Sequence, residues 1–297
     1  MTLYLGLDGG GTGCRAVVAD EFSVLGQGAG GAANPGAVGV TAAWESVDHA
    51  VDAALTDAGL GGDAKPLLRA CFGLAGVGRP GDREAFLGRP HPFASLRLET
   101  DVHVALVGAL GDWVGGEGGA VLAAGTGSMV YAQDENGGRY RVGGWGFPVG
   151  DEGGGAWLGL ALARAALHAA DGRGEASGLT ETVLGRCGGP EGLLQRLHHA
   201  GPKDFAQFAP LVFEASADDP LRERLLREAA GQLGALVTAL DHRFPPGAVA
   251  FSAVGSIARK LLPNVLGGIP ARFRAGYREA AASPELGALR LAGWRGQ

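Results

Sequence analysis

The chain has 297 residues, of which 46% are hydrophobic and 19% charged, and its formal net charge is −6. This length suits two domains of ordinary size, and the composition is that of a folded globular protein. A mildly acidic chain lacks the basic footprint of a nucleic-acid-binding protein, and no apolar stretch suits a signal peptide or a membrane span. The cysteines, Cys14, Cys71 and Cys187, form no CxxC pair, so we expect a reducing cytoplasm and neither disulfides nor a zinc site.

Apolar periodicity divides the chain into two similar halves. In the first half we expect strands at 3–8, 14–20, 24–30, 69–74 and 96–100, and helices at 41–58 and 102–110. In the second half we expect strands at 119–124, 129–133, 139–143 and 248–254, and helices at 156–170, 221–242, 256–266 and 283–294. One module, which is a strand, a glycine-threonine turn and a strand followed by further elements, therefore occurs twice in the pattern, although the halves share almost no residues beyond the turn and chance similarity is the alternative. This order predicts an α/β protein with mixed sheets flanked by helices.

The first expected strand ends in Asp8-Gly9-Gly10-Gly11-Thr12. Glycines leave backbone N–H groups accessible, so such a turn can form an anion-binding concavity to which Thr12 adds a hydroxyl donor. Asp8 is a candidate for holding Mg²⁺ directly or through water. A plain hairpin turn is the alternative, since Gly-Gly turns are common. Neither the dinucleotide pattern GxGxxG nor the Gly-Lys pair of a P-loop is present, so any phosphate site here lies between two strands.

A second turn of the same chemistry, Gly125-Thr126-Gly127-Ser128, follows the equivalent strand of the second half. Two such turns on duplicated halves predict a polyphosphate clamp in a cleft between two domains. The junction Val254-Gly255-Ser256 follows a buried strand and opens a helix. It is a candidate contact for a nucleotide base or ribose, and an ordinary strand-to-helix junction is the alternative.

The segment from 143 to 155 combines many glycines with Trp145, Phe147, Asp151 and Glu152. A flexible linker would be rich in serine and lysine and would lack tryptophan. An aromatic ring beside carboxylates is a common way to bind a sugar, because the ring covers a C–H face while the carboxylate accepts from hydroxyls. The alternative is a lid loop in which Trp145 is packed at a hinge.

Asp101 follows the strand at 96–100, at the end of a sheet where ligands commonly bind. A carboxylate there can take the proton of an attacking hydroxyl, as phosphoryl transfer requires. Asp101 also precedes an apolar helix, so its alternative role is that of helix N-cap. The seven histidines are isolated or adjacent to each other and predict no metal site.

These motifs resemble those of the actin-like ATPase superfold of sugar kinases. More closely, the chain resembles the N-acetylglucosamine kinase family, within the group that also holds the BadF/BadG/BcrA/BcrD-type ATPases. The resemblance covers nearly the whole chain and is carried by LGLDGGGT (5–12), AAGTGS (123–128) and GGWG..VGDEGGGAWLG (143–159). It implies two actin-like (ribonuclease H-like) domains with mixed five-stranded sheets and a cleft between them. We expect these domains at 1–112, closed by a helix at 283–297, and at 113–282.

The resemblance also implies roles for individual residues. ATP and Mg²⁺ are the implied cofactors, with Asp8 orienting the metal and Asp101 acting as catalytic base. The residues implied to contact ATP are Gly10, Gly11, Thr12, Thr126, Gly127 and Gly255. The residues implied to contact the sugar are Asn34, Gly76, Asp101, Ser128, Gly144, Trp145 and Asp151. The resemblance further implies a cytoplasmic homodimer.

Two departures from the family pattern concern the substrate. Met129 stands where acetamido-sugar kinases often carry Asn, and Ala75 stands where they often carry Ser. The expected reaction is phosphorylation of an amino sugar at its 6-hydroxyl, with N-acetylglucosamine and glucosamine as first candidates and N-acetylmuramate and N-acetylmannosamine still open. Two other functions remain possible: an ATPase that activates a partner enzyme through an iron–sulfur cluster, for which Cys187 is the one suggestive residue, and a sugar sensor without catalysis.

Overall fold

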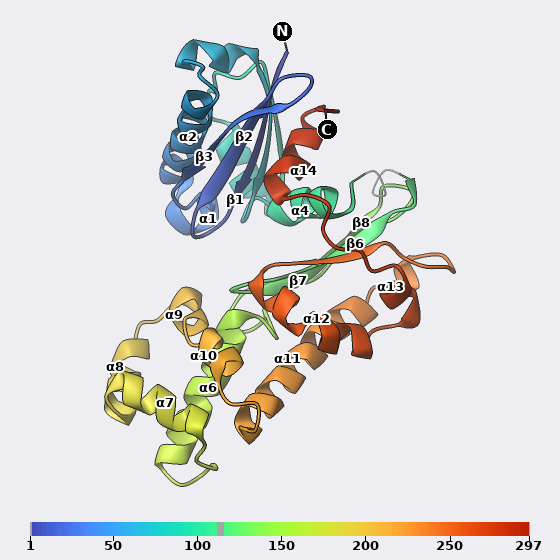
Figure 1. Cartoon of the computed structure of the whole chain (residues 1–297). Helices are drawn as coiled ribbons and strands as arrows, with labels where there is room; N and C mark the ends of the chain where they lie inside the picture. Colours follow the sequence, from blue (N-terminus) through green and yellow to red (C-terminus); the bar gives the residue numbers. More distant parts are fainter. Residues whose placement is uncertain (1, 112–115, 297) are drawn as a thin grey trace. The chain divides into compact units, whose positions relative to one another are not determined.

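The computed structural model describes residues 2–111 and 116–296 (Figure 1). The chain forms two compact units, Met1–Val121 with Arg278–Gln297, and Leu122–Tyr277. The boundary predicted between residues 112 and 113 lies outside the described residues. No helix in the described ranges is long and apolar enough to cross a membrane.

The first unit is built on a five-stranded sheet. Its strands are β1 (Leu3–Gly9), β2 (Cys14–Ala19), β3 (Val24–Gly30), β4 (Leu68–Leu74) and β5 (Ser95–Thr100). Its helices are α1 (Pro35–Val38), α2 (Val40–Asp57), the 3₁₀ helix η1 (Gly62–Leu67), α3 (Pro80–Leu87), α4 (Asp101–Leu110) and α14 (Pro284–Leu291). The strand order is β3-β2-β1-β4-β5, with β1 to β3 antiparallel and β1, β4 and β5 parallel. The expected opening meander and mixed sheet are confirmed.

The core on one side of this sheet lies under α2, which bears the predicted helical stripe. Trp44 of α2 is 4% exposed, stacks on Phe86 of α3 with ring centroids 4.5 Å apart, and donates its indole N–H to the Phe86 carbonyl. A buried indole needs such a partner for its N–H, so this bond fixes the ring in the core. Phe72 of β4 packs edge-on against Trp44.

Glycines of β3 explain part of the high glycine content. A Cβ built on Gly26, Gly28 or Gly30 would lie 2.2–2.4 Å from a backbone carbonyl oxygen of α2. These three residues alternate along the strand and therefore face the same side of the sheet. Glycine at all three lets the backbone of α2 approach the sheet more closely than any side chain would allow.

The end of the chain belongs to the first unit (Figure 1). Helix α14 packs against α4 and β1, and Gly6 of β1 has no room for a Cβ because the Glu285 carbonyl would be 2.2 Å away. Trp294, predicted as the last residue of the closing helix, lies beyond the end of α14 at Leu291. It is 4% exposed and donates its indole N–H to the Asp20 carbonyl at 2.9 Å, so the chain stays packed on the first unit past the helix.

The second unit combines a smaller sheet with most of the helices. Its strands are β6 (Gly119–Ala124), β7 (Ser128–Gln133), β8 (Arg139–Gly143) and β9 (Phe251–Val254). Its helices are α6 (Gly155–Ala170), α7 (Gly178–Cys187), α8 (Pro190–Leu197), α9 (Pro202–Ala206), α10 (Ala209–Glu214), α11 (Pro220–Thr238), η2 (Asp241–Arg243), α12 (Ser256–Gly268) and α13 (Ala271–Ala275). Asp219 caps α11 by accepting from the Leu221 and Arg222 N–H groups.

The second sheet has four strands in the order β8-β7-β6-β9, so the expectation of five strands in each domain is wrong for this one. Beside β9, the chain makes a single parallel bridge between Phe251 and Tyr277, with the Phe251 N–H donating to the Gly276 carbonyl. Just beyond it, the N–H groups of Ala281 and Ala282 donate to α4 of the first unit. The chain around Tyr277 forms no fifth strand in the described residues, and from Arg278 it continues into the first unit toward α14.

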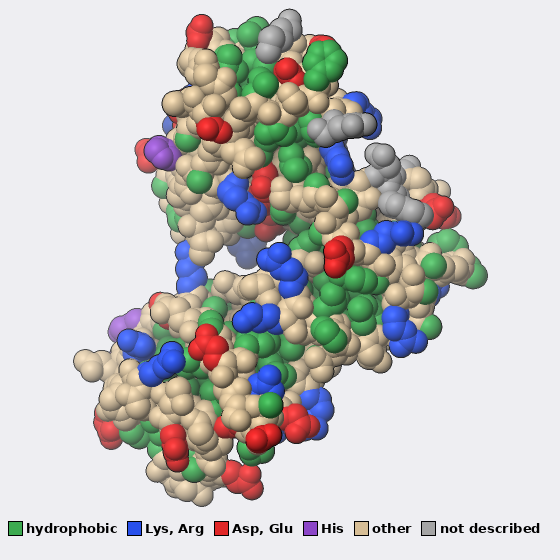
Figure 2. Space-filling model, in the orientation of Figure 1, with side chains coloured by type: hydrophobic (Ala, Val, Ile, Leu, Met, Phe, Trp, Pro, Cys, Tyr) green, Lys and Arg blue, Asp and Glu red, His purple; other side chains and the backbone are tan. Residues whose placement is uncertain are grey.

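The surface carries interspersed acidic and basic side chains on the face drawn in Figure 2. The most exposed large apolar side chains of the described residues are Val149, Phe22 and Trp145, at 88%, 78% and 75% exposure. Trp145 and Val149 both lie in the glycine-rich segment that sequence patterns connect with a ligand, so this segment presents an apolar surface to solvent.

Candidate active site

The first phosphate-binding candidate is the turn between β1 and β2. The Gly10 N–H donates to the Gly13 carbonyl at 2.9 Å and closes the turn, so this N–H is used within the turn and is not offered outward. Thr12 is exposed at its tip. A Cβ on Gly10 or Gly11 would meet no heavy atom within 4 Å, whereas one on Gly9 would lie 2.6 Å from Leu74. Gly9 is therefore needed for packing, while the space beside Gly10 and Gly11 is open.

Asp8 precedes this turn and lies opposite Arg15 in the β1–β2 register. Their side chains form an ion pair of 3.3 Å, and Arg15 also pairs with Glu285 of α14 at 3.4 Å. Burial and, after it, the negative charge of Asp101 raise the pKa of Asp8 to about 6, although Arg15 acts in the opposite direction. The carboxylate is thus short of positive charge even with its arginine partner.

Asp101 is the first residue of α4. Thr100 is the N-cap, because its hydroxyl accepts from the His103 N–H at 3.3 Å, so the alternative role of Asp101 as N-cap is wrong. Burial raises the pKa of Asp101 to about 6. Because the cap is supplied by the preceding side chain, the Asp101 carboxylate is not needed to begin the helix.

The two acids fit a divalent cation. Burial destabilises both carboxylates, the negative charge of Asp101 further destabilises that of Asp8, and a nearby dication would relieve these effects. The described residues contain no group of three or more His, Cys, Asp or Glu side chains suited to a metal. Mg²⁺ suits this sparse set, because it keeps several waters and commonly binds through one or two carboxylates plus substrate phosphates.

Two predicted sugar contacts lie beside the first turn. The Ala33 N–H donates to the Gly10 carbonyl and the Ala75 N–H to the Gly9 carbonyl, at 2.9 and 2.8 Å. These bonds place the following residues, Asn34 and Gly76, next to each other, and a Cβ on Gly76 would be 2.2 Å from Asn34 Oδ1. Gly76 also has φ +88°, which favours glycine.

The oxygen of the Asn34 carboxamide takes part in this local structure. Its Oδ1 accepts from the Gly36 N–H at 3.0 Å and caps α1. An amide with its oxygen fixed in this way has a defined orientation, with its NH₂ directed by the same bond. The structure therefore brings together Asn34, Gly76 and the turn between β1 and β2, which come from three separate parts of the sequence.

The second turn joins β6 to β7 and is tied to the start of α6. The N–H groups of Gly155 and Ala156 donate to the carbonyls of Gly125 and Thr126 at 2.7 and 2.9 Å. Thr126 is exposed at the tip, and a Cβ on Gly125 would meet no atom within 4 Å. This turn repeats the features of the first one: an exposed threonine beside open space at a glycine.

Asp151 and Gly127 are in direct contact. A Cβ on Gly127 would lie 2.4 Å from Asp151 Oδ2, and Asp151 has φ +63°, a positive value that is uncommon outside glycine. Burial raises the pKa of Asp151, while the backbone N–H groups of Gly146 and Ser128 lower it. Asp151, a predicted sugar contact within the glycine-rich segment, therefore packs against the Gly125–Ser128 turn.

The other predicted sugar contacts of this unit differ in exposure. Ser128 is 4% exposed and donates its hydroxyl to the Glu152 carbonyl at 2.6 Å, so that proton is used internally. The Gly144 N–H donates to the Ser128 carbonyl, and a Cβ on Gly144 would lie 2.3 Å from Met129 Cε. Trp145 is 75% exposed, with the Arg141 guanidinium 4.7 Å from its ring centroid.

A pocket of about 240 Å³ lies within the second unit beside its turn. Its lining comprises Gly125, Thr126, Gly155, Ala206, Ala209, Pro210, Phe213, Ser256, Ile257 and Lys260. Lys260 Nζ lies 4.6 Å from the Phe213 ring centroid. Small, apolar and aromatic walls next to the Gly125–Ser128 turn suit a flat heterocycle such as a nucleobase.

Gly255 adjoins this pocket but has a structural reason to be glycine. Its φ is +97°, and a Cβ would lie 2.2 Å from the Ala124 carbonyl oxygen. The lining residues of α9 and α10, which include Phe213, and Lys260 of α12 were not anticipated from the sequence. They carry no motif, and only the fold brings them to the turn.

Comparison with known proteins identifies the group to which this chain is related. The BadF/BadG/BcrA/BcrD ATPase family profile matches residues 5–291. The chain belongs to this family. It is 36% identical to glucosamine kinase GspK of Vibrio cholerae over 264 residues, covering 88% of this chain and 87% of that protein. The family match, residues 5–291, covers both glycine-threonine turns and the glycine-rich segment.

Solved structures agree with the fold. A candidate N-acetylglucosamine kinase from Chromobacterium violaceum superimposes with a TM-score of 0.87 at 33% identity, covering 98% of this chain and 99% of that one. A ROK-family glucokinase from Streptomyces griseus, at 18% identity, gives a TM-score of 0.53 and covers 98% and 99%. The family and the α/β actin-like fold expected from the sequence motifs are therefore confirmed.

Proposed function

We propose that this protein transfers the γ-phosphoryl group of ATP to a hydroxyl of an amino sugar, with Asp101 as general base. The observation that carries the proposal is the pair of acids in the first unit. Asp101 opens α4 with a pKa of about 6, and its charge acts on Asp8 at the end of β1. A base whose pKa lies near neutrality is well matched to deprotonating a hydroxyl during transfer. The similarity to amino-sugar kinases supplies the substrate class.

In the proposed reaction, Asp101 accepts the proton of the sugar hydroxyl as that oxygen bonds to the γ-phosphorus. The bond from the γ-phosphorus to the bridging oxygen breaks, and ADP leaves with that oxygen. Asp8 would hold Mg²⁺ and its waters, and this ion would supply positive charge to the phosphates. The protein's own contribution is orientation, by the two threonine-bearing turns, and acceptance of the proton.

Each unit supplies part of the proposed ligand set. From the first unit we assign Gly10, Gly11 and Thr12 to phosphate and Asn34 and Gly76 to sugar. From the second we assign Thr126, Gly127 and the junction at Gly255 to the nucleotide, whose base would occupy the pocket lined by Phe213 and Lys260. Ser128, Gly144, Trp145 and Asp151 complete the proposed sugar set.

Glucosamine and N-acetylglucosamine, phosphorylated at the 6-hydroxyl, are the proposed substrates. The relatives above divide between these two sugars. Met129 packs over Gly144 and presents a thioether where a polar side chain would bind a substituent. A site without such a polar partner discriminates weakly against a substrate that lacks the matching group. We therefore expect both sugars to be turned over.

The test is a coupled ADP-release assay with ATP, Mg²⁺ and a panel of amino sugars, together with a no-sugar control. The wild type should release ADP only when glucosamine or N-acetylglucosamine is present. Asp101→Asn should abolish transfer while still binding ATP, as measured by calorimetry. Sugar phosphate formation at the wild-type rate by Asp101→Asn would overturn the base assignment, and equal turnover without sugar would overturn the kinase assignment.

A further inference from the structure

The strand that leads directly into Asp101, β5, is at the edge of its sheet. Within the described part of the chain, β5 is hydrogen-bonded to β4 only, and α4 begins at Asp101 without an intervening loop. An edge strand has neighbours on one side only and frays more readily than a central one. The position of Asp101 therefore depends on whatever else holds the β5–α4 junction.

The body of α4 is fixed by close packing. A Cβ on Gly73 of β4 would lie 2.1 Å from Val104, and one on Gly108 would lie 2.4 Å from the Ser283 carbonyl oxygen. These contacts begin in the second half of the first turn. The residues before them, from 98 to 103, are held by the pairing of β5 with β4 as far as Thr100, by the burial of Leu98 and Val102, and by polar side chains that join the strand to the helix.

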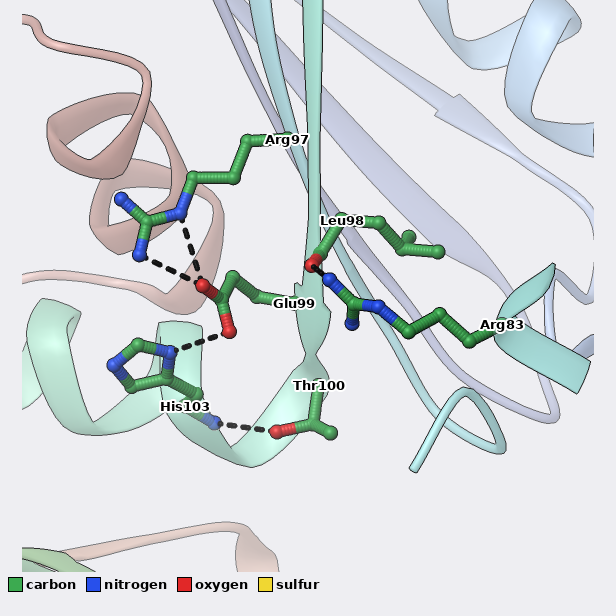
Figure 3. Close-up of polar contacts among 6 residues, drawn as sticks. All are labelled: Arg83, Arg97, Leu98, Glu99, Thr100 and His103. Atoms are coloured by element: carbon green, nitrogen blue, oxygen red, sulfur yellow. Dashed lines mark hydrogen bonds and ion pairs between the residues drawn. The ribbon is translucent and has the colours of Figure 1, made fainter. Parts of the chain in front are cut away.

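Figure 3 shows these polar contacts. Arg83 of α3 approaches β5 from one side and donates to the Leu98 carbonyl at 2.5 Å. On the other side, Glu99 Oε1 accepts from Arg97 Nε and Nη2 at 2.9 and 2.7 Å. Glu99 Oε2 lies 2.9 Å from His103 Nδ1, and Thr100 caps the helix through the His103 N–H.

The Glu99–His103 pair is buried, with exposures of 7% and 2%. An ionised carboxylate only accepts, so Nδ1 carries the proton in this pair. A buried carboxylate is costly without such donors, and a bond between two buried groups also holds them in one geometry. The two residues lie two positions before and two positions after Asp101, so the bond closes a brace around it.

We propose that Glu99, His103 and Arg83 are positioning residues that hold the Asp101 carboxylate in place for proton transfer. The Glu99–His103 bond joins the end of β5 to the first turn of α4, and Arg83 holds β5 from the opposite side. This inference rests on the proposed role of Asp101 as base. It adds that the geometry of the base is set by a buried acid–histidine pair and an arginine, none of which touches the reacting atoms.

The experiment compares His103→Leu, which removes the donor, with His103→Asn, whose amide can donate in place of Nδ1. At saturating ATP and sugar, His103→Leu should lower kcat about 10- to 100-fold, the loss expected when a catalytic group is displaced by about 1 Å. The KM for ATP should stay within about twofold, and His103→Asn should recover most of kcat. Amide hydrogen exchange over residues 101–104 should be faster in His103→Leu and near normal in His103→Asn.

Trp294→Phe is the matched control, because it also removes a side-chain hydrogen bond of a buried residue in the first unit, the one to the Asp20 carbonyl, in a cluster with Val17, Ala19 and Leu289. It should lower Tm while leaving kcat and exchange over 101–104 unchanged. If His103→Leu fails to fold, Arg83→Met tests the same brace from a partly exposed position and should lower kcat in the same way.

A kcat in His103→Leu or Arg83→Met no lower than in Trp294→Phe would overturn the inference, whatever the exchange data show. Equal kcat losses in His103→Leu and His103→Asn would also overturn it, because the donor would then be irrelevant. The proposed function itself fails if the wild-type protein phosphorylates no sugar, a result that does not depend on the variants. In that case the exchange comparison alone decides whether the brace holds the start of α4.

Discussion

The turn after β1 contains two kinds of glycine, and substituting them separates packing from ligand binding. Gly10→Ala places a methyl group where no protein atom lies within 4 Å, and Gly10 has no positive φ that would exclude alanine. Folding should therefore tolerate it, with a gain of about 0.4–1 kcal/mol from the restricted unfolded chain. Gly9→Ala instead forces a Cβ to 2.6 Å from Leu74 and 2.9 Å from Ala33. Overpacking of this kind costs about 1–3 kcal/mol.

The two variants should have opposite effects on binding and stability. If the ATP phosphates occupy the open space beside Gly10, the added methyl group displaces them and weakens a charge-assisted hydrogen bond from another donor of the turn, such as the Thr12 hydroxyl, worth about 1.5–3 kcal/mol. The KM for ATP should rise roughly 10- to 150-fold in Gly10→Ala at an unchanged or higher Tm. Gly9→Ala should lower Tm.

The assay is an ATP titration of ADP release at saturating amino sugar, paired with thermal unfolding by circular dichroism. An unchanged KM for ATP in a well-folded Gly10→Ala variant would refute the assignment of this turn to phosphate. A large loss of stability in Gly10→Ala would refute the view that the space beside it is kept open for a ligand.

Four further outcomes follow from the site. Because Asp101 must be ionised to accept a proton and its pKa is about 6, kcat/KM should be flat above pH 7 and fall about tenfold per pH unit below 6, and a flat profile down to pH 5 would contradict this role. Because the pKa of Asp8 is raised to about 6, its ionisation opposes folding increasingly from pH 4 and fully above pH 6. Asp8→Asn should therefore raise the Tm of the metal-free protein at pH 7.5, with a gain in unfolding free energy on the order of 2 kcal/mol that shrinks toward pH 4. Calorimetry across this pH range checks the sign. Lys260→Met should raise the Kd for ADP several-fold by calorimetry with little change in kcat, and unchanged binding would remove the pocket from the nucleotide site. Trp145→Ala should raise the sugar KM tenfold or more without lowering Tm, since the ring is 75% exposed; a changed Tm with normal KM would instead make it a packing residue.

The sequence by itself determined the features that depend on neighbours along the chain. The alternating apolar residues of β1 and β2 predict a hairpin, and the glycines between them can only form a tight turn, so both threonine-bearing turns were placed correctly. The stripe containing Trp44 predicts α2, because helical periodicity requires only local spacing. The family motifs then fix the fold, since they extend over nearly the whole chain.

Only the tertiary structure decided what depends on distant segments. It distinguishes Gly9, which packs against Leu74 of β4, from Gly10, which faces open space, although the two are equivalent in sequence. It assigns the α4 cap to Thr100 rather than Asp101, and it assembles the Phe213 and Lys260 pocket from helices that carry no motif. It also ends the second sheet at four strands, because the chain must return to the first unit. Each of these follows from contacts between residues far apart in the chain, which no local pattern records.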